Sequence, residues 1–333
     1  MSRLGIASFA LHDTTNKHIF DYETPQAEAH EVKVKNINPY LVDASDIVLK
    51  SRQEPLSNAL PIAFGSMPND GGYLLLSSEE KANLIELDPN SIRWIRRLFG
   101  SNEFINNKEL WCLWLVNISP NELRSMPTIM RRVESVRCHR LKSSRPTTQE
   151  LARTPSLFGE IRQPNTGYLA IPKTSSEGRS YIPIGFLDSE TIASSELFTV
   201  SNAKLFHFGI LTSAMHMAWV KSICGRLKSD YRYSARIVYN NFPWPQAMTD
   251  KQKLTIEKAA QEVLDARAKF SNSSLADLYD PLTMPPELVK AHNKLNAAVD
   301  TAYSKKKFSS ESERLVFLFE QYQQLAAAQS ITT

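Results

Sequence analysis

Seven charged or aromatic side chains are concentrated in eleven residues near the middle of the chain, and their types suit contacts with nucleic acid. They are Arg226, Lys228, Asp230, Tyr231, Arg232, Tyr233 and Arg236. Arginine and lysine donate to phosphates and guanine edges, aspartate accepts from a cytosine amine, and tyrosine stacks or donates. A solvated charged loop is the alternative, and composition alone favours it.

The segment before this cluster predicts a helix that would hold the cluster in place. Its apolar residues recur at three- and four-residue steps, the spacing of a helix face packed into a core: Leu205, Phe208, Leu211, Met215, Trp219 and Ile223. Ser201 and Asn202 are suited to capping the start of the helix, and Gly225 to ending it. We therefore expect one largely buried helix that delivers the charged cluster to the surface.

A second basic stretch lies between residues 121 and 142. Past Pro127, apolar residues at helical spacing predict an inner face, and the outer face carries Arg131, Arg132, Arg137, Arg140 and Lys142. A helix laid along a phosphate backbone would bind through such a face without reading sequence, because cations displace counterions. A solvated surface helix is the alternative. Arg179, in a tip at residues 173–180, is a further candidate for a phosphate contact, although a plain hairpin turn fits equally well.

Size and composition limit the number of domains, the class of protein and the compartment that can be expected. The 333 residues suffice for one large domain and a small one, or for two or three modest domains, and 42% hydrophobic with 22% charged residues is ordinary for a globular protein. A net charge of +4 permits nucleic-acid binding without demanding it. Three scattered cysteines favour a reducing cytoplasm over a disulfide framework. No apolar run approaches the roughly 20 residues of a membrane span, and the N-terminus is not typical of a signal peptide.

The chain divides into three parts. Residues 1–25 contain two strand-like runs, at 4–11 and 18–22, joined by a polar turn. Residues 26–246 begin with a polar connector and then mix short strands with helices, whereas residues 247–333 have capping signals and periodicity typical of helices. These patterns predict an α+β fold, in which a mixed domain with short strands and a buried central helix precedes a small all-α C-terminal bundle.

Six segments resemble signatures of a known family, and they occur in the expected order. They are INPYLVDASDIVLKSR (37–52), PIAFGSMPNDGGYLLLS (61–77), FGSNEFINNKELWCLWL (99–115), SYIPIGFLD (180–188), GRLKSDYRYSARIVYNNFPWP (225–245) and LADLYDPLTMPPELVKAHNKLNAAVDTAY (275–303). The chain resembles the specificity region of MmeI-like enzymes, type II restriction–modification proteins in which one polypeptide carries nuclease, adenine-methyltransferase and target-recognition modules. The resemblance covers nearly the whole chain.

The resemblance implies a division of labour along the chain. Residues 26–246 would be the target-recognition domain and 247–333 the C-terminal helical domain. Residues 1–25 would be the end of a methyltransferase sheet, although a hairpin belonging to the present domain is nearly as good an interpretation. The parent family methylates adenine at specific DNA sites.

The catalytic motifs of such an enzyme are absent from this sequence. Adenine methylation needs a glycine-rich loop for S-adenosylmethionine and an (Asp/Asn)-Pro-Pro-(Tyr/Phe) loop for the flipped base. The 11 glycines form no such loop, and the stretch 241–244 has Phe242 where the first proline belongs. We predict no catalytic or metal-binding residue and no cofactor in this chain. S-adenosylmethionine, and Mg²⁺ for cleavage, are implied only for the full-length enzyme.

The resemblance also implies which side chains read bases. Lys228 and Asp230 match the family's major-groove loop and suit one G·C pair, with lysine donating to guanine and aspartate accepting from cytosine. Arg232, with Ser195 or Glu196, would face a neighbouring pair. A Lys228–Asp230 surface ion pair, worth under about 1 kcal/mol, is the alternative. The remaining candidates are, for the DNA backbone, Arg131, Arg132, Arg137, Arg140, Lys142, Arg179, Arg226 and Arg236, and, for stacking or groove contacts, Tyr231 and Tyr233.

The predicted function is thus a sequence-specific module for double-stranded DNA that is not catalytic by itself and works at the nucleoid of a bacterial cytoplasm. Two other functions stay open. One is the specificity subunit of a split methyltransferase that is active only with a separate catalytic chain. The other is a truncated remnant or a protein-interaction module, against which the basic segments 124–145 and 226–236 argue weakly.

Overall fold

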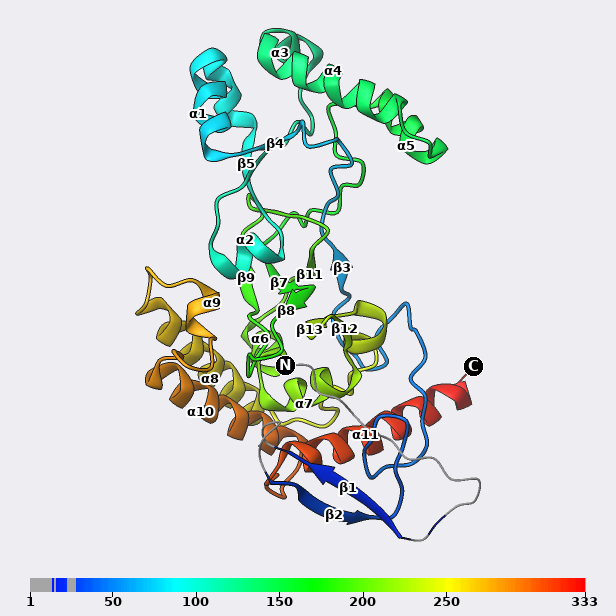
Figure 1. Ribbon diagram of the computed structural model, residues 1–333. Coiled ribbons are helices and arrows are strands. Elements are labelled where there is room, and N and C mark those ends of the chain that lie inside the picture. The colour runs from blue at the N-terminus through cyan, green and yellow to red at the C-terminus, as the bar shows by residue number, and fades with distance from the viewer. Residues whose placement is uncertain (1–13, 15, 23–27, 333) are drawn as a thin grey trace.

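The computed structural model describes residues 14, 16–22 and 28–332 (Figure 1). Helices are combined with four small sheets, so the predicted α+β fold is confirmed. The strand expected at residues 4–11 lies outside the described residues. Among the residues that are described, no helix has both the length and the apolar character needed to cross a membrane.

One end of the molecule, at the top of Figure 1, is a lobe built on a four-stranded sheet in the order β10-β5-β6-β4. Its strands are β4 (Leu75–Leu76), β5 (Ile95–Phe99), β6 (Trp111–Leu113) and β10 (Ile192–Ala193). Its helices are α1 (Ser78–Leu87), η1 (Pro89–Trp94), α3 (Pro120–Arg124), α4 (Pro127–Leu141), α5 (Pro146–Glu150) and η2 (Leu151–Arg153). The helix predicted after Pro127 is confirmed as α4, whose Ile129, Val133 and Val136 enter the core of the lobe.

The middle of the molecule contains an antiparallel sheet in the order β3-β11-β7-β9. Its strands are β3 (Ala63–Phe64), β7 (Tyr168–Pro172), β9 (Gly185–Leu187) and β11 (Leu197–Ser201), and α2 (Ser101–Asn106) packs against β7. All five residues of β7 are buried, because both faces of this strand are covered. A smaller sheet, in the order β12-β13-β8, consists of β8 (Thr174–Ser175), β12 (Gly225–Leu227) and β13 (Asp230–Arg232).

The single helix predicted between residues 201 and 225 is wrong in one respect, because two helices occupy this stretch: α6 (Leu205–Leu211) and α7 (Ala214–Ile223). The helix is interrupted at Ser213. The hydroxyl of Ser213 donates to the Ile210 carbonyl at 2.7 Å and accepts from the His216 amide at 3.4 Å. A serine can thus replace backbone partners on both sides of a helix break. The predicted cap is also displaced, since Ser201 ends β11 and Lys204 precedes α6. The apolar periodicity hides the break because both helices are buried.

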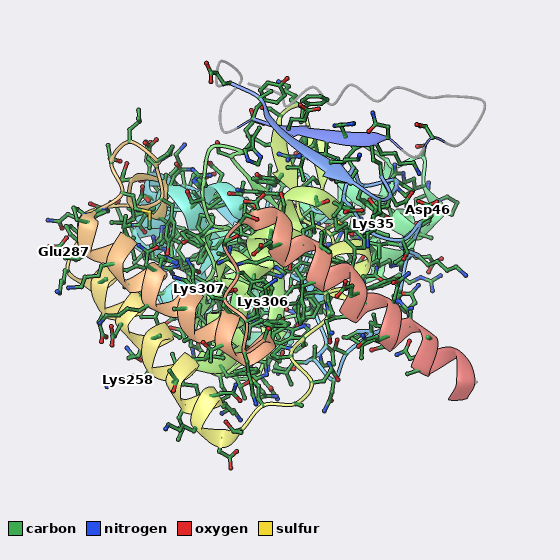
Figure 2. All side chains as sticks on the ribbon, turned by 90° about the horizontal axis from the view of Figure 1, so that it is seen from below. Lys35, Asp46, Lys258, Glu287, Lys306 and Lys307 are labelled. Atoms are coloured by element: carbon green, nitrogen blue, oxygen red, sulfur yellow. The ribbon has the colours of Figure 1, made fainter. Side chains whose placement is uncertain are left out.

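The C-terminal part is helical as predicted, but it does not form a separate bundle. Its helices are α8 (Asp250–Ala268), α9 (Leu275–Leu278), α10 (Pro286–Tyr303) and α11 (Glu311–Thr332), and the capping box at Thr249 is confirmed. Helix α8 packs against α10 and α6, whereas α11 packs against α7. One hydrophobic core therefore joins these helices to the middle of the molecule. Figure 2 shows α8, α10 and α11 from below, with Lys306 and Lys307 on the loop between α10 and α11.

A hairpin near the N-terminus includes a strand that the sequence did not predict. Strand β1 (Lys17–Asp21) overlaps the predicted run at 18–22, and among the described residues it pairs with β2 (His30–Val34), in the stretch predicted to be a polar connector. Four of the five residues of β2 are exposed, which explains why its sequence gives little signal of a strand.

Burial of His216 on α7 predicts an acid-sensitive fold. Burial lowers the pKa of His216 to about 3, from an ordinary value of 6.5. Below pH 6.5 the unfolded chain binds a proton that the folded chain rejects, so stability falls as the pH drops from about 6.5 toward 3. For His216 alone we expect a loss of about 2 kcal/mol between pH 7 and pH 5.

Urea unfolding at the two pH values measures this loss. His216→Gln should reduce the difference between pH 7 and pH 5, whereas His139→Gln, at an exposed site on α4, should leave it unchanged. Equal pH dependence in all three proteins would contradict the prediction.

Candidate nucleic-acid interface

A two-residue turn, Lys228-Ser229, joins β12 to β13 and presents the charged cluster. The register pairs Leu227 with Asp230, and β13 pairs in turn with β8. Lys228 has a φ of 56°, in the left-handed region that a lysine seldom adopts, at a strain of about 1–3 kcal/mol. Two-residue hairpin turns usually place glycine or asparagine in this conformation. The turn must therefore be held by its surroundings.

Two tyrosines hold the hairpin from beneath. Tyr231 and Tyr233 are 3% and 2% exposed, and the Tyr233 hydroxyl lies 2.9 Å from Nε2 of His216 on α7. Burial raises the pKa of Tyr233 well above its ordinary value. The prediction that these rings stack on DNA or enter a groove is wrong, because both are enclosed in the hydrophobic core. They connect the hairpin to the end of α7 instead.

The predicted base-reading side chains on the hairpin are accessible. Lys228 and Arg232 are exposed and Asp230 is half-buried. The Lys228 ammonium forms no hydrogen bond or ion pair with any residue that the structure describes, and in particular none with Asp230. The surface ion pair considered as an alternative is thus not formed, and both groups remain available to a ligand.

Ser195 and Glu196 lie on the turn between β10 and β11, and Lys173 connects this turn to the hairpin. The Lys173 amide donates to the Glu196 carbonyl at 3.1 Å, and its carbonyl accepts from the Tyr233 amide at 2.7 Å. Strand pairing sets Thr174 opposite Arg232. The structure therefore brings together the two groups of predicted base-reading residues, although they are more than 30 positions apart in sequence.

Sequence reasoning missed Lys173. Its ammonium lies 4.4 Å from the centre of the Phe64 ring. Burial lowers the pKa of Lys173, the charge of Glu196 opposes this shift, and Arg232 reinforces it. Lys173 thus lies within electrostatic reach of both predicted readers. Only the pairing of β8 with β13 reveals this position, so no local sequence signal would have found it.

The predicted backbone contacts near the hairpin differ in their surroundings. Arg236 is exposed, on the π-helical turn η3 (Ala235–Tyr239). Arg179 is half-buried and donates to the Ser175 hydroxyl at 3.4 Å. Burial lowers the pKa of Arg179, and the charges of Asp230 and Asp280 oppose this shift. Arg226 folds back onto the hairpin, as described below.

The structure overturns one prediction on α4. Arg140 is fully buried, and its guanidinium donates to five backbone carbonyls at 2.8–3.0 Å, those of Pro68, Asn69, Leu151, Thr154 and Leu157. Burial lowers its pKa, and the charge of Asp70 opposes this shift. Arg140 cannot contact a DNA phosphate, because all its donors face inward. It connects the segment at residues 68–69 to the segment at residues 151–157.

The other cations of α4 fall into two groups. Arg132 donates to the Tyr73 and Leu75 carbonyls and forms an ion pair with Glu80 at 2.6 Å, so its charge is neutralised within the fold. The other cations are exposed: Arg131, Arg137, which forms an ion pair with Glu134 at 3.4 Å, and Lys142, the residue that follows the helix. Figure 1 shows α4 well separated from β12 and β13, so these cations would contact a different part of any duplex.

A further basic run, Lys305-Lys306-Lys307, is exposed on the loop between α10 and α11 (Figure 2). This run was not among the predicted DNA contacts, although three consecutive lysines are evident in the sequence. A metal site is not apparent: no three histidine, cysteine or acidic side chains are grouped to hold an ion within the described part of the chain.

Comparison with known proteins gives concordant matches. A family model for the MmeI target recognition domain matches residues 43–246, and one for the MmeI C-terminal domain matches residues 248–329. The chain is 41% identical over 321 residues to DNA methyltransferase A of Bacillus subtilis (strain 168), covering 96% of this chain and 36% of that protein. It is also similar to a solved structure of the type IIL restriction–modification enzyme MmeI in complex with DNA. The TM-score is 0.88 and the identity 46%, over 95% of this chain and 42% of the other. The chain thus spans less than half the length of these relatives.

Replacing Arg140 should damage the fold rather than a DNA contact. Arg140→Met removes five hydrogen bonds to carbonyls and leaves those of Asn69 and Leu157 without a donor among the described residues, so we expect the free energy of unfolding to fall by on the order of 3 kcal/mol. The matched control is Arg137→Met on the exposed face of α4, which should change stability by less than about 0.5 kcal/mol. Chemical denaturation measures both variants. Equal stability of Arg140→Met and the unaltered protein would contradict the structural role.

Proposed function

The chain belongs to the MmeI family, as the resemblance of its sequence predicted, and we propose that it reads a specific sequence of double-stranded DNA on behalf of an adenine methyltransferase. The observation that carries this proposal is the hairpin β12–β13. Lys228 and Arg232 are exposed on it, each without an ion pair among the residues that the structure describes, beside a half-buried Asp230. Donors and an acceptor on a strained, externally supported turn are suited to the edges of base pairs.

Lys228 and Asp230 act together on one G·C pair in this proposal. The ammonium donates to O6 or N7 of guanine, and the carboxylate accepts from N4 of cytosine. Arg232 faces the neighbouring pair, together with Ser195 or Glu196 across the Lys173 connection. The hairpin would thus read one base pair by itself and the adjacent pair together with the turn at Ser195 and Glu196.

The exposed cations of α4 and η3 bind phosphates without reading sequence. They are Arg131, Arg137, Lys142 and Arg236, with Arg179 closer to the hairpin. Because α4 lies away from the hairpin, its contacts would fix the orientation of the duplex beyond the bases that are read. Such contacts release counterions and make the affinity depend on salt. DNA as the partner would place the protein at the nucleoid of a bacterial cytoplasm.

Methyl transfer and cleavage are proposed for the part of such an enzyme that this chain does not span. The residues of this chain do not suit S-adenosylmethionine, since they provide neither a glycine-rich loop nor a loop for the flipped base. They do not suit a resident Mg²⁺ either, because the described residues provide no acidic cluster. A specificity subunit that works with a separate catalytic chain is the second candidate function.

Selection from a randomised duplex pool across a salt series tests the proposal. Enrichment of a short asymmetric site containing a G·C pair, with an affinity that falls steeply with salt, is the expected result. Binding without enrichment would mean that the module reads sequence only with its catalytic part, and adding a methyltransferase chain should then restore selectivity. Absence of binding at low salt, with or without that chain, would refute DNA recognition.

Removing the reading pair should change specificity and leave the fold intact. Lys228→Ala with Asp230→Ala should lower discrimination at one base pair by about 1–3 kcal/mol, without a change in thermal midpoint. The matched control, Lys142→Ala, should instead weaken binding to all sequences equally and reduce the salt slope by about 0.9. An unchanged base preference in the double variant would eliminate the assignment of this pair.

A further inference from the structure

Arg226 lies on β12, two residues before Lys228, and its guanidinium folds back over the hairpin. Nη1 donates to the Ser229 carbonyl at 3.1 Å, and the guanidinium carbon lies 4.0 Å from the centre of the Tyr231 ring. Nη2 donates to the Lys221 carbonyl at 3.4 Å, near the end of α7. Glu177, on the tip after β8, lies 4.0 Å from Nη1. One side chain thus contacts the turn, the strand beside it, the preceding helix and the neighbouring tip.

These contacts need the shape of arginine as well as its charge. A planar guanidinium can stack on a ring and donate in its own plane to two carbonyls, whereas a lysine ammonium is a point charge on a flexible stem. The carbonyl that Nη1 binds belongs to Ser229, the second residue of the turn. Fixing this carbonyl fixes the Ser229–Asp230 peptide plane and so the residue directly after Lys228, whose own backbone is held in the left-handed region.

We propose that Arg226 is a positioning residue, which holds the Lys228-Ser229 turn in the conformation that directs Lys228 to its base and does not itself bind a phosphate. The inference rests on the proposed function, because it concerns the same reading hairpin. It replaces the sequence prediction that Arg226 contacts the DNA backbone. The guanidinium faces two carbonyls, a ring and a carboxylate of its own chain, an environment that fixes orientation within the fold.

Arg226→Lys tests the proposal because it keeps the charge and removes the planar contacts. Selection from a randomised duplex pool, with affinities measured across a salt series, should show discrimination at the G·C pair of Lys228 falling about tenfold. The preference at the neighbouring pair and the salt slope should stay unchanged. The matched control is Arg153→Lys, on an arginine that is exposed in the upper lobe and paired with Glu150. It should alter none of these quantities.

A double-mutant cycle isolates the route of the effect. In a Lys228→Ala background, Arg226→Lys should cause no further loss of discrimination, because the residue it positions has gone. All three residues of β12 are exposed, so the core remains filled, and thermal unfolding of each variant checks this. Should Arg226→Lys unfold the protein, Arg226→Met, which keeps the stem over Tyr231, takes its place in the same cycle.

The outcomes separate this inference from the function on which it rests. If the unaltered protein enriches a site and Arg226→Lys keeps the same preference, the positioning role is refuted and DNA reading stands. In Arg226→Met, a uniform loss of affinity with a salt slope smaller by about 0.9 would make Arg226 a phosphate contact and equally refute the inference. Additive losses of discrimination in the double-mutant cycle would also refute the inference. If the unaltered protein enriches nothing, even with a methyltransferase chain added, both proposals fall.

Discussion

The structure depends on pairing the backbone groups of segments that belong to no helix or sheet. Carbonyls that face the protein need donors, and irregular segments cannot obtain them from a strand ladder. Asn240 and Asn241 supply them for the segment near residue 50: Nδ2 of Asn240 donates to the Arg52 and Gln53 carbonyls, and Nδ2 of Asn241 to that of Lys50. The Leu56 amide in turn donates to the Asn240 carbonyl. Asn240 and Asn241, at the start of the stretch that was compared with the loop for the flipped base, therefore join two segments that are almost 190 residues apart in sequence.

The same constraint decides which cations can meet a ligand. Arg140 serves five carbonyls, Arg132 two, and Arg226 two, so the guanidinium groups are divided between the fold and the surface. Neither the net charge nor a run of charged residues in the sequence shows which arginines bind carbonyls within the fold and which face solvent. Lys228, at the tip of the hairpin, is exposed, and its ammonium donates to no carbonyl among the residues that the structure describes.

The sequence predicted what depends on local pattern and missed what depends on distant partners. Helices α4, α8 and α10 follow from apolar periodicity, proline at the first turn and the capping box at Thr249, since each signal lies within a few residues. The position of Lys173 could not be predicted, because strand β8 exists only through its pairing with β13. Arg140 was misassigned for a related reason: an arginine that binds distant carbonyls and one that faces solvent look alike in a charged helix. The predicted readers Lys228, Asp230 and Glu196 were found by family resemblance, and their roles remain predictions.

The C-terminal helices determine where the β12–β13 hairpin begins. Helix α7 ends at Ile223, two residues before β12, and its Trp219 packs on Phe319 and Tyr322 of α11. Nε1 of Trp219 donates to the Val238 carbonyl at 3.0 Å, which connects α7 to the segment that follows the hairpin. Further along, Nη1 of Arg267 on α8 donates to the Ile184 carbonyl at 2.6 Å, and its Nε donates to the Tyr279 hydroxyl, which also lies 2.8 Å from Nε2 of His292. Both ends of the hairpin thus rest on one core that the C-terminal helices complete. The helical part therefore supports the β12–β13 hairpin, and its separation from the mixed domain would remove the support of α7.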